Sequence, residues 1–117
     1  MKKSILNIIE KYNLKDDLEH IFGIENPDND PDLPPEYKRK KDFVYSSLKY
    51  IPKIIDEIKT KTGIKLNNPS ISPFEEDSLD FSWKTNEYSL LANVSKNSGV
   101  SYYMMDSKQK ELAKGSL

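Results

Sequence analysis

The fold of this chain is decided by residues 79–94, which read LDFSWKTNEYSLLANV. On either side of the polar stretch 84–87, apolar residues alternate with polar ones, a period typical of half-buried strands joined by a turn. A further alternating set follows a second turn, and its members are Val100, Tyr102 and Met104. The pattern therefore predicts an antiparallel meander of three strands, extended to a fourth if a short edge strand forms near the start of residues 69–105.

The apolar pattern also predicts the register of the meander. In the first hairpin, pairing Trp83 with Tyr88 keeps the apolar residues of both strands on one face. In the second, pairing Val94 with Val100 does the same. The short strand is expected around Ile71, where prolines on both sides restrict it to an edge of the sheet.

The residues before the sheet have helical periodicity. Residues 1–23 predict two short helices, and residues 24–35 carry four prolines among acidic residues, which predicts a loop. Apolar residues then recur at spacings of four and three across 36–63, which predicts one long helix, kinked near residue 50 by Pro52. The polar tail 106–117 is expected to fray.

A small sheet needs a cover, so we expect the long helix to lie across the apolar face of the meander. The predicted fold class is therefore α+β, with N-terminal helices and one long kinked helix packed on a three- to four-stranded antiparallel meander. All 117 residues are expected to form a single domain, since this length suffices for one modest core.

The composition argues against several classes of activity. The chain has no cysteine and one histidine, which excludes disulfides and thiolate sites and argues against a histidine-rich metal site or a catalytic triad. We therefore expect a protein that is not an enzyme and uses no cofactor or metal. The first residues lack a signal-peptide pattern, and no stretch is apolar enough for a membrane span, which favours a cytoplasmic protein without membrane contact.

One surface of the predicted sheet carries unexpected apolar residues. The register places Leu91, Tyr103 and Met105 together on the face opposite the core. An apolar cluster among serine and asparagine residues on such a face suggests a contact with a protein partner or with a second copy. Equally, the N-terminal helices or the C-terminal tail can cover this cluster, and both interpretations stay open.

A basic run supports an alternative function. Lys38, Arg39, Lys40 and Lys41 follow each other near the start of the predicted long helix, where cations oppose the helix dipole. Contact with nucleic-acid phosphates is the functional interpretation. An ordinary solvated helix face is favoured, because acidic residues precede the run and the net charge is −1.

Carboxylates offer a third and weaker interpretation. Glu75, Glu76 and Asp80 lie close in sequence beside the predicted sheet, and paired carboxylates can perform acid–base chemistry. No nucleophile–base pair or glycine-rich phosphate loop accompanies them. Ordinary turn chemistry therefore explains them better than catalysis.

The C-terminal half also resembles a family of small uncharacterised prokaryotic proteins. The residues that carry this resemblance are the Pro-Ser-Ile-Ser-Pro segment 69–73, the strand that ends in Trp83, and the Gly-Val-Ser-Tyr-Tyr segment 99–103. The resemblance implies a helix followed by a small antiparallel sheet, and no established activity. Its association with mobile or defence-type neighbourhoods implies an accessory or antitoxin-like role.

Overall fold

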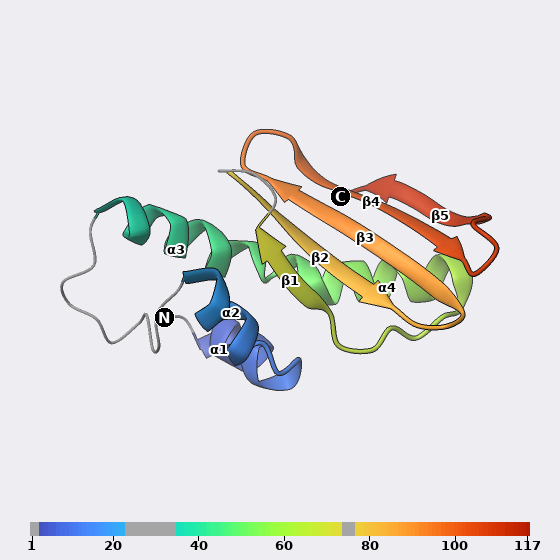
Figure 1. Cartoon of the computed structure of the whole chain (residues 1–117), viewed down its shortest axis with the longest axis horizontal. Helices are drawn as coiled ribbons and strands as arrows, with labels where there is room; N and C mark the ends of the chain where they lie inside the picture. The colour runs from blue at the N-terminus through green and yellow to red at the C-terminus, as the bar shows by residue number, and fades with distance from the viewer. Residues whose placement is uncertain (1–2, 23–34, 74–76) are drawn as a thin grey trace.

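The computed structural model describes residues 3–22, 35–73 and 77–117, and it confirms an α+β fold (Figure 1). The helices are α1 (Lys3–Lys11), α2 (Lys15–Phe22), α3 (Pro35–Ser47) and α4 (Tyr50–Thr62). The strands are β1 (Ser70–Pro73), β2 (Ser78–Lys84), β3 (Tyr88–Ser95), β4 (Gly99–Asp106) and β5 (Glu111–Ser116). The predicted acidic loop, apart from Pro35, lies outside the described residues.

The strands form one antiparallel sheet in the order β1-β2-β3-β4-β5. The prediction of a short strand around Ile71 is confirmed, and this strand lies at an edge. The prediction of three to four strands is wrong by one strand, since the described residues form a sheet of five. The additional strand is β5, in the part of the chain that we expected to be a frayed polar tail.

Residues 111–116 can form a strand although they are mostly polar, because a strand at this position needs only small residues on its core-facing side. Only Ala113 and Gly115 of β5 face the core side, where they pair with Met104 and Tyr102. The hydroxyl of Tyr102 lies so close to Gly115 that a Cβ there would be 2.8 Å from the oxygen. Only small side chains fit on the core-facing side of β5. The strand therefore lacks the alternation of large apolar and polar residues by which a strand is predicted from sequence.

The two hairpins differ in how well their register was predicted. Between β3 and β4, Val94 pairs with Val100 as expected. Between β2 and β3, Trp83 pairs with Leu90 and not with Tyr88, so that prediction is wrong by two residues. A shift of two residues leaves every side chain on its predicted face, because strand side chains alternate with period two.

The turn explains the corrected register. The Thr85 amide donates to the Tyr88 carbonyl at 2.9 Å, which closes a loop of only residues 86 and 87. The Thr85 hydroxyl accepts hydrogen bonds from the amides of Glu87 and Tyr88 at 3.1 and 3.2 Å. Such serine/threonine turns satisfy loop donors locally, which makes the short loop favourable.

The long helix is interrupted, as Pro52 predicts, but slightly earlier than expected. The break between α3 and α4 lies at Leu48 and Lys49, and Pro52 is the third residue of α4. The first amides of a helix have no partner within the helix, so the missing proline N–H costs nothing at this position. At the other end, Gly63 adopts a left-handed conformation with φ 76° and closes α4.

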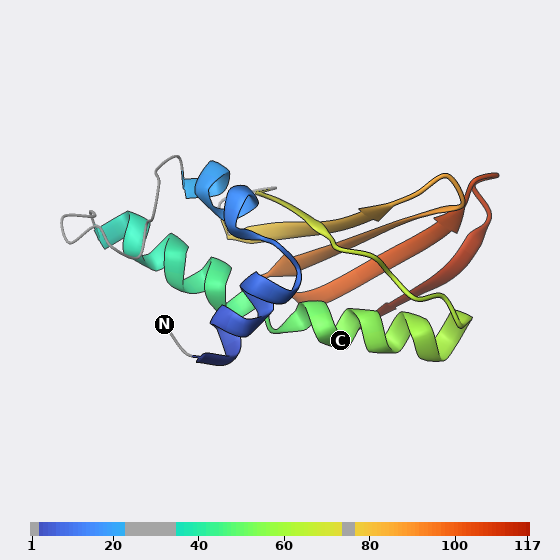
Figure 2. The same cartoon turned by 90° about the horizontal axis from the view of Figure 1, so that it is seen from below.

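The core lies between the sheet and the helices. Helix α4 lies along one face of the sheet, and α1 and α2 lie beside its β1 end (Figure 2). The buried residues of these elements and of the connections between the helices form one apolar cluster, whose largest members include Trp83, Phe81, Leu14, Leu48, Ile51 and Leu90. The buried Trp83 indole donates to the Asn67 carbonyl at 2.7 Å, which satisfies its only polar atom.

Candidate interaction surface

The outer face of the sheet is the face opposite α4, and two of the predicted residues meet at its centre. Leu91 of β3 pairs directly with Tyr103 of β4. They are 51% and 41% exposed, whereas the preceding Leu90 is 1% exposed on the core face. The exposure of Leu91 is therefore not a result of poor packing of β3 against the core, since Leu90 on the same strand is fully buried.

The third predicted residue extends the same patch towards β5. Met105 is partly buried and lies opposite both Ser89 of β3 and Glu111 of β5. The register between β4 and β5 shifts at this point, which leaves Leu112 as an extra residue in a β-bulge. Leu112 is 37% exposed, and it shares with Glu111 the position opposite Met105 on the outer face, because two residues of a bulge oppose one residue of the partner strand.

We call Leu91, Tyr103, Met105 and Leu112 the outer apolar patch. Sequence reasoning missed Leu112, because it treated residues 106–117 as a tail. The only available signal was weak: a single leucine in a polar segment, followed by small residues that suit a crowded sheet edge.

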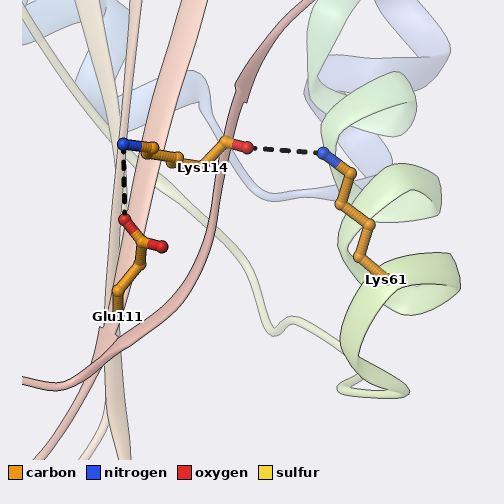
Figure 3. Close-up of polar contacts among 3 residues, drawn as sticks. All are labelled: Lys61, Glu111 and Lys114. Carbon is orange, nitrogen blue, oxygen red and sulfur yellow. Dashed lines mark hydrogen bonds and ion pairs between the residues drawn. The ribbon is translucent and has the colours of Figure 1, made fainter.

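Polar contacts surround the outer apolar patch. The Asn93 amide donates to the Asp80 carboxylate at 2.8 Å across β2 and β3. On the other side, the Lys114 ammonium lies 3.8 Å from Glu111 Oε1 along β5 (Figure 3). An apolar centre with a polar margin is the usual anatomy of a protein–protein contact.

The two segments that we considered as covers for this face do not reach it in the described part of the chain. Helices α1 and α2 contribute Ile9, Leu18 and Ile21 to the core cluster. The C-terminal residues extend the sheet sideways as β5 and do not fold over it. The patch is consequently open to solvent among the described residues.

The basic run lies in α3, where Lys38, Arg39 and Lys40 belong to the helix. Their side chains lie outside what the structure describes. Lys41 is partly exposed, and its ammonium lies 5.9 Å from the centre of the Tyr45 ring. The basic run 38–41 therefore lies on helix α3, and the outer apolar patch lies on strands β3, β4 and β5.

Two further lysines lie close to one aromatic ring near the break between α3 and α4. The ammonium groups of Lys49 and Lys53 lie 5.2 and 5.6 Å from the centre of the Tyr50 ring. Such contacts are weakly stabilising cation–π pairs on the protein itself. Acidic Asp56 and Glu57 follow on the same helix, so the basic character does not continue unbroken along α4.

Of the carboxylates that we considered for catalysis, only Asp80 belongs to the described residues. Asp80 already accepts the hydrogen bond from Asn93, and Glu75 and Glu76 lie outside the described residues. In the described ranges, no group of three or more histidine or acidic residues is placed to hold a metal ion. No helix in these ranges is long and apolar enough to cross a membrane.

A polar cluster anchors β5 on the core side of the sheet. The Lys61 ammonium of α4 donates to the Tyr102 hydroxyl at 2.5 Å and to the Lys114 carbonyl at 3.4 Å (Figure 3 draws the second contact). The hydrogen bond to Tyr102 raises the pKa of Lys61 above its ordinary value of 10.5. Burial raises the pKa of Tyr102 above its ordinary value of 10.0; the hydrogen bond from Lys61 opposes this shift, and nearby Glu57 adds to it. At neutral pH the pair is therefore an ammonium and a neutral phenol.

Comparisons with protein-family models, with curated proteins and with solved structures find no match to this chain. The resemblance of its C-terminal half to small prokaryotic proteins therefore stays a prediction. The candidate site rests on the geometry of the outer face alone.

Proposed function

We propose that this protein is a non-catalytic protein-binding module that contacts its partner through the outer apolar patch. The observation that carries the proposal is the exposure of Leu91 and Tyr103, which lie opposite each other at the centre of the sheet. Large apolar residues that cluster on an otherwise polar face mark interaction sites more often than chance exposure. The resemblance described above supports an accessory or antitoxin-like subunit of a prokaryotic defence or mobile-element system as the biological setting.

The chemistry of the patch supports a protein partner over a polyanion. Tyr103 offers a rigid aromatic surface with a polar tip, the kind of side chain that is enriched at the centre of protein interfaces. Leu91 and Met105 add flexible and aliphatic area around it. Asp80, beside the patch, would repel phosphate groups.

The test is affinity capture of the tagged protein from its native host, with and without nuclease treatment. The double variant Leu91→Asp with Tyr103→Asp places two charges at the centre of the patch. We expect it to keep the far-UV spectrum and melting temperature of the wild type, because both side chains are exposed. We also expect it to lose a partner that the wild type retains stoichiometrically under both treatments.

A matched control carries the same added charge elsewhere. Asn86→Asp with Ser98→Asp changes two exposed turn residues and should retain the partner fully. Equal capture by the patch variant and by this control would refute the proposal. Capture that disappears on nuclease treatment would instead favour the basic run, for which binding should weaken with salt by a log–log slope of about −0.7 per contacted single-strand phosphate.

A further inference from the structure

The two edge strands of the sheet, β1 and β5, differ in whether their outward backbone groups can pair with another strand. At the β1 edge, the strand ends in Pro73, and the Ile71 amide donates to the Asp17 carboxylate of α2 at 3.0 Å. Helix α2 packs against this strand. A proline and an occupied amide close the edge, because they leave few groups with which another strand can pair.

The β5 edge carries backbone groups that point away from the sheet. The Leu117 amide donates to the Val100 carbonyl at 2.9 Å, which makes that pair a hydrogen-bonded one. Hydrogen-bonded pairs alternate along an antiparallel ladder, so Gly115 also bonds to β4, whereas Lys114 and Ser116 direct their amides and carbonyls outward. The outward direction of the Lys114 carbonyl is independently visible in its contact with Lys61.

Each face of the sheet presents one ammonium group at this edge, and on the outer face that group lies 3.8 Å from Glu111 Oε1. Lys114 lies on the outer face, and 69% of its side chain is exposed. Lys61 reaches the edge from α4 on the opposite side, and its 3.4 Å contact with the Lys114 carbonyl is long for a hydrogen bond. A strand that arrives at this edge can therefore displace Lys61 from the carbonyl at little cost and then meets two ammonium groups.

We propose that the β5 edge accepts an extended segment of a partner protein as a sixth strand. The segment presents an apolar side chain opposite Leu112 and acidic side chains opposite Lys114 and Gly115. The first contact continues the outer apolar patch, and the acidic side chains pair with Lys114 on one face and Lys61 on the other. This inference rests on the proposed protein-binding function, to which it adds the mode of binding and the chemistry of the partner.

A second copy of the chain fits this edge less well. Antiparallel self-pairing that joins Lys114 to an outward residue of the second copy places the twofold axis at Lys114, if Lys114 pairs with itself, or at Gly115, if Lys114 pairs with Ser116. The first arrangement sets two Lys114 side chains directly opposite each other, which is destabilising. The second brings together the Lys61 ammonium groups of both copies, since each lies 3.1 Å from the position that a Cβ on Gly115 would occupy.

The test uses the full chain labelled with ¹⁵N and a blocked heptapeptide of sequence Thr-Thr-Glu-Glu-Val-Val-Thr. We expect the peptide to shift the amide signals of Lys114 and Ser116 and to slow their hydrogen exchange, with no change at Ile71 on the closed edge. A peptide with both glutamates replaced by lysines should have no effect. Absence of shifts at millimolar peptide, or an equal response to both peptides, would overturn the inference.

Variants at Ser116 and Lys114 distinguish binding by strand pairing from non-specific binding of the peptide. Ser116→Pro removes one outward donor and no bond to β4, so it should weaken binding about fivefold, whereas Ser116→Thr retains the donor and should bind like the wild type. Lys114→Glu should weaken binding of the acidic peptide and reduce the preference between the two peptides, because only the Lys61 ammonium remains to pair with it. A well-dispersed spectrum confirms that each variant is folded.

The failure of this inference is distinguishable from failure of the proposed function. If the peptide does not bind but the Leu91→Asp with Tyr103→Asp variant still loses its captured partner, the outer face binds the partner without strand addition. If the peptide binds and the double variant captures normally, the edge is a binding site and the outer apolar patch is not.

Discussion

The Lys61 ammonium donates to the Tyr102 hydroxyl at 2.5 Å, and this contact joins the last turn of α4 to the fourth strand of the sheet. It lies directly beneath Gly115 of β5. The contact thus couples three elements that are distant in sequence, and it fixes the edge at which we propose that a partner strand binds.

The first prediction concerns pH. The pKa of Lys61 is raised by its hydrogen bond to Tyr102, and the pKa of Tyr102 is raised by burial, so the folded state holds both protons more tightly than the unfolded chain does. Below about pH 10 both states are protonated and this contribution is intact. As the pH rises through the folded-state values, the unfolded chain releases its protons first, and stability falls.

Urea unfolding between pH 7 and pH 11.5 measures this effect. The wild type should lose stability above pH 10, and Tyr102→Phe should lose less over the same interval because it has no phenol to titrate. Tyr103→Phe is the matched control, since the Tyr103 side chain is 41% exposed and outside this contact. Identical pH profiles for Tyr102→Phe and Tyr103→Phe would contradict the assignment.

The second prediction concerns Gly115. An added methyl group there would lie 2.8 Å from the Tyr102 oxygen and 3.1 Å from the ring carbon that carries it, so β5 or the ring must move. We expect Gly115→Ala to lower the free energy of unfolding by about 1–3 kcal/mol. Combining it with Tyr102→Phe removes the closer contact and should recover part of this loss.

A double-mutant cycle from urea denaturation measures that coupling. Strict additivity of the two substitutions would show that the Tyr102 hydroxyl does not limit the space at Gly115. Ser116→Ala, one position further along β5, is the control and should change stability little because Ser116 is exposed.

The third prediction concerns the closed edge. Asp17→Ala removes the acceptor of the Ile71 amide and should destabilise the protein by about 1–2 kcal/mol, with faster hydrogen exchange at Ile71. Asp16→Ala removes a neighbouring charge from the same first turn of α2 and should leave that exchange rate unchanged. Comparable acceleration in both variants would mean that the helix dipole, and not the hydrogen bond, protects β1.

Sequence reasoning succeeded where periodicity alone carries the information. The alternation around Phe81 and Trp83 determined which side chains face the core, and it therefore also placed Leu91, Tyr103 and Met105 together on the outer face. The proline at 52 similarly determined that the long helix is interrupted. Both results follow from local geometry, because strand side chains alternate and proline lacks a donor regardless of what packs against them.

Only the tertiary structure decided the register of the first hairpin, the presence of β5 and the contrast between the two sheet edges. A two-residue shift preserves the period, so the pattern could not distinguish pairing Trp83 with Tyr88 from pairing it with Leu90. Strand β5 has almost no apolar side chains because Tyr102 and α4 already fill the space beneath it, which makes its sequence resemble a polar tail. Its position beside β4 arises from backbone pairing and from the close fit of Gly115, and neither leaves a periodic signal in the sequence.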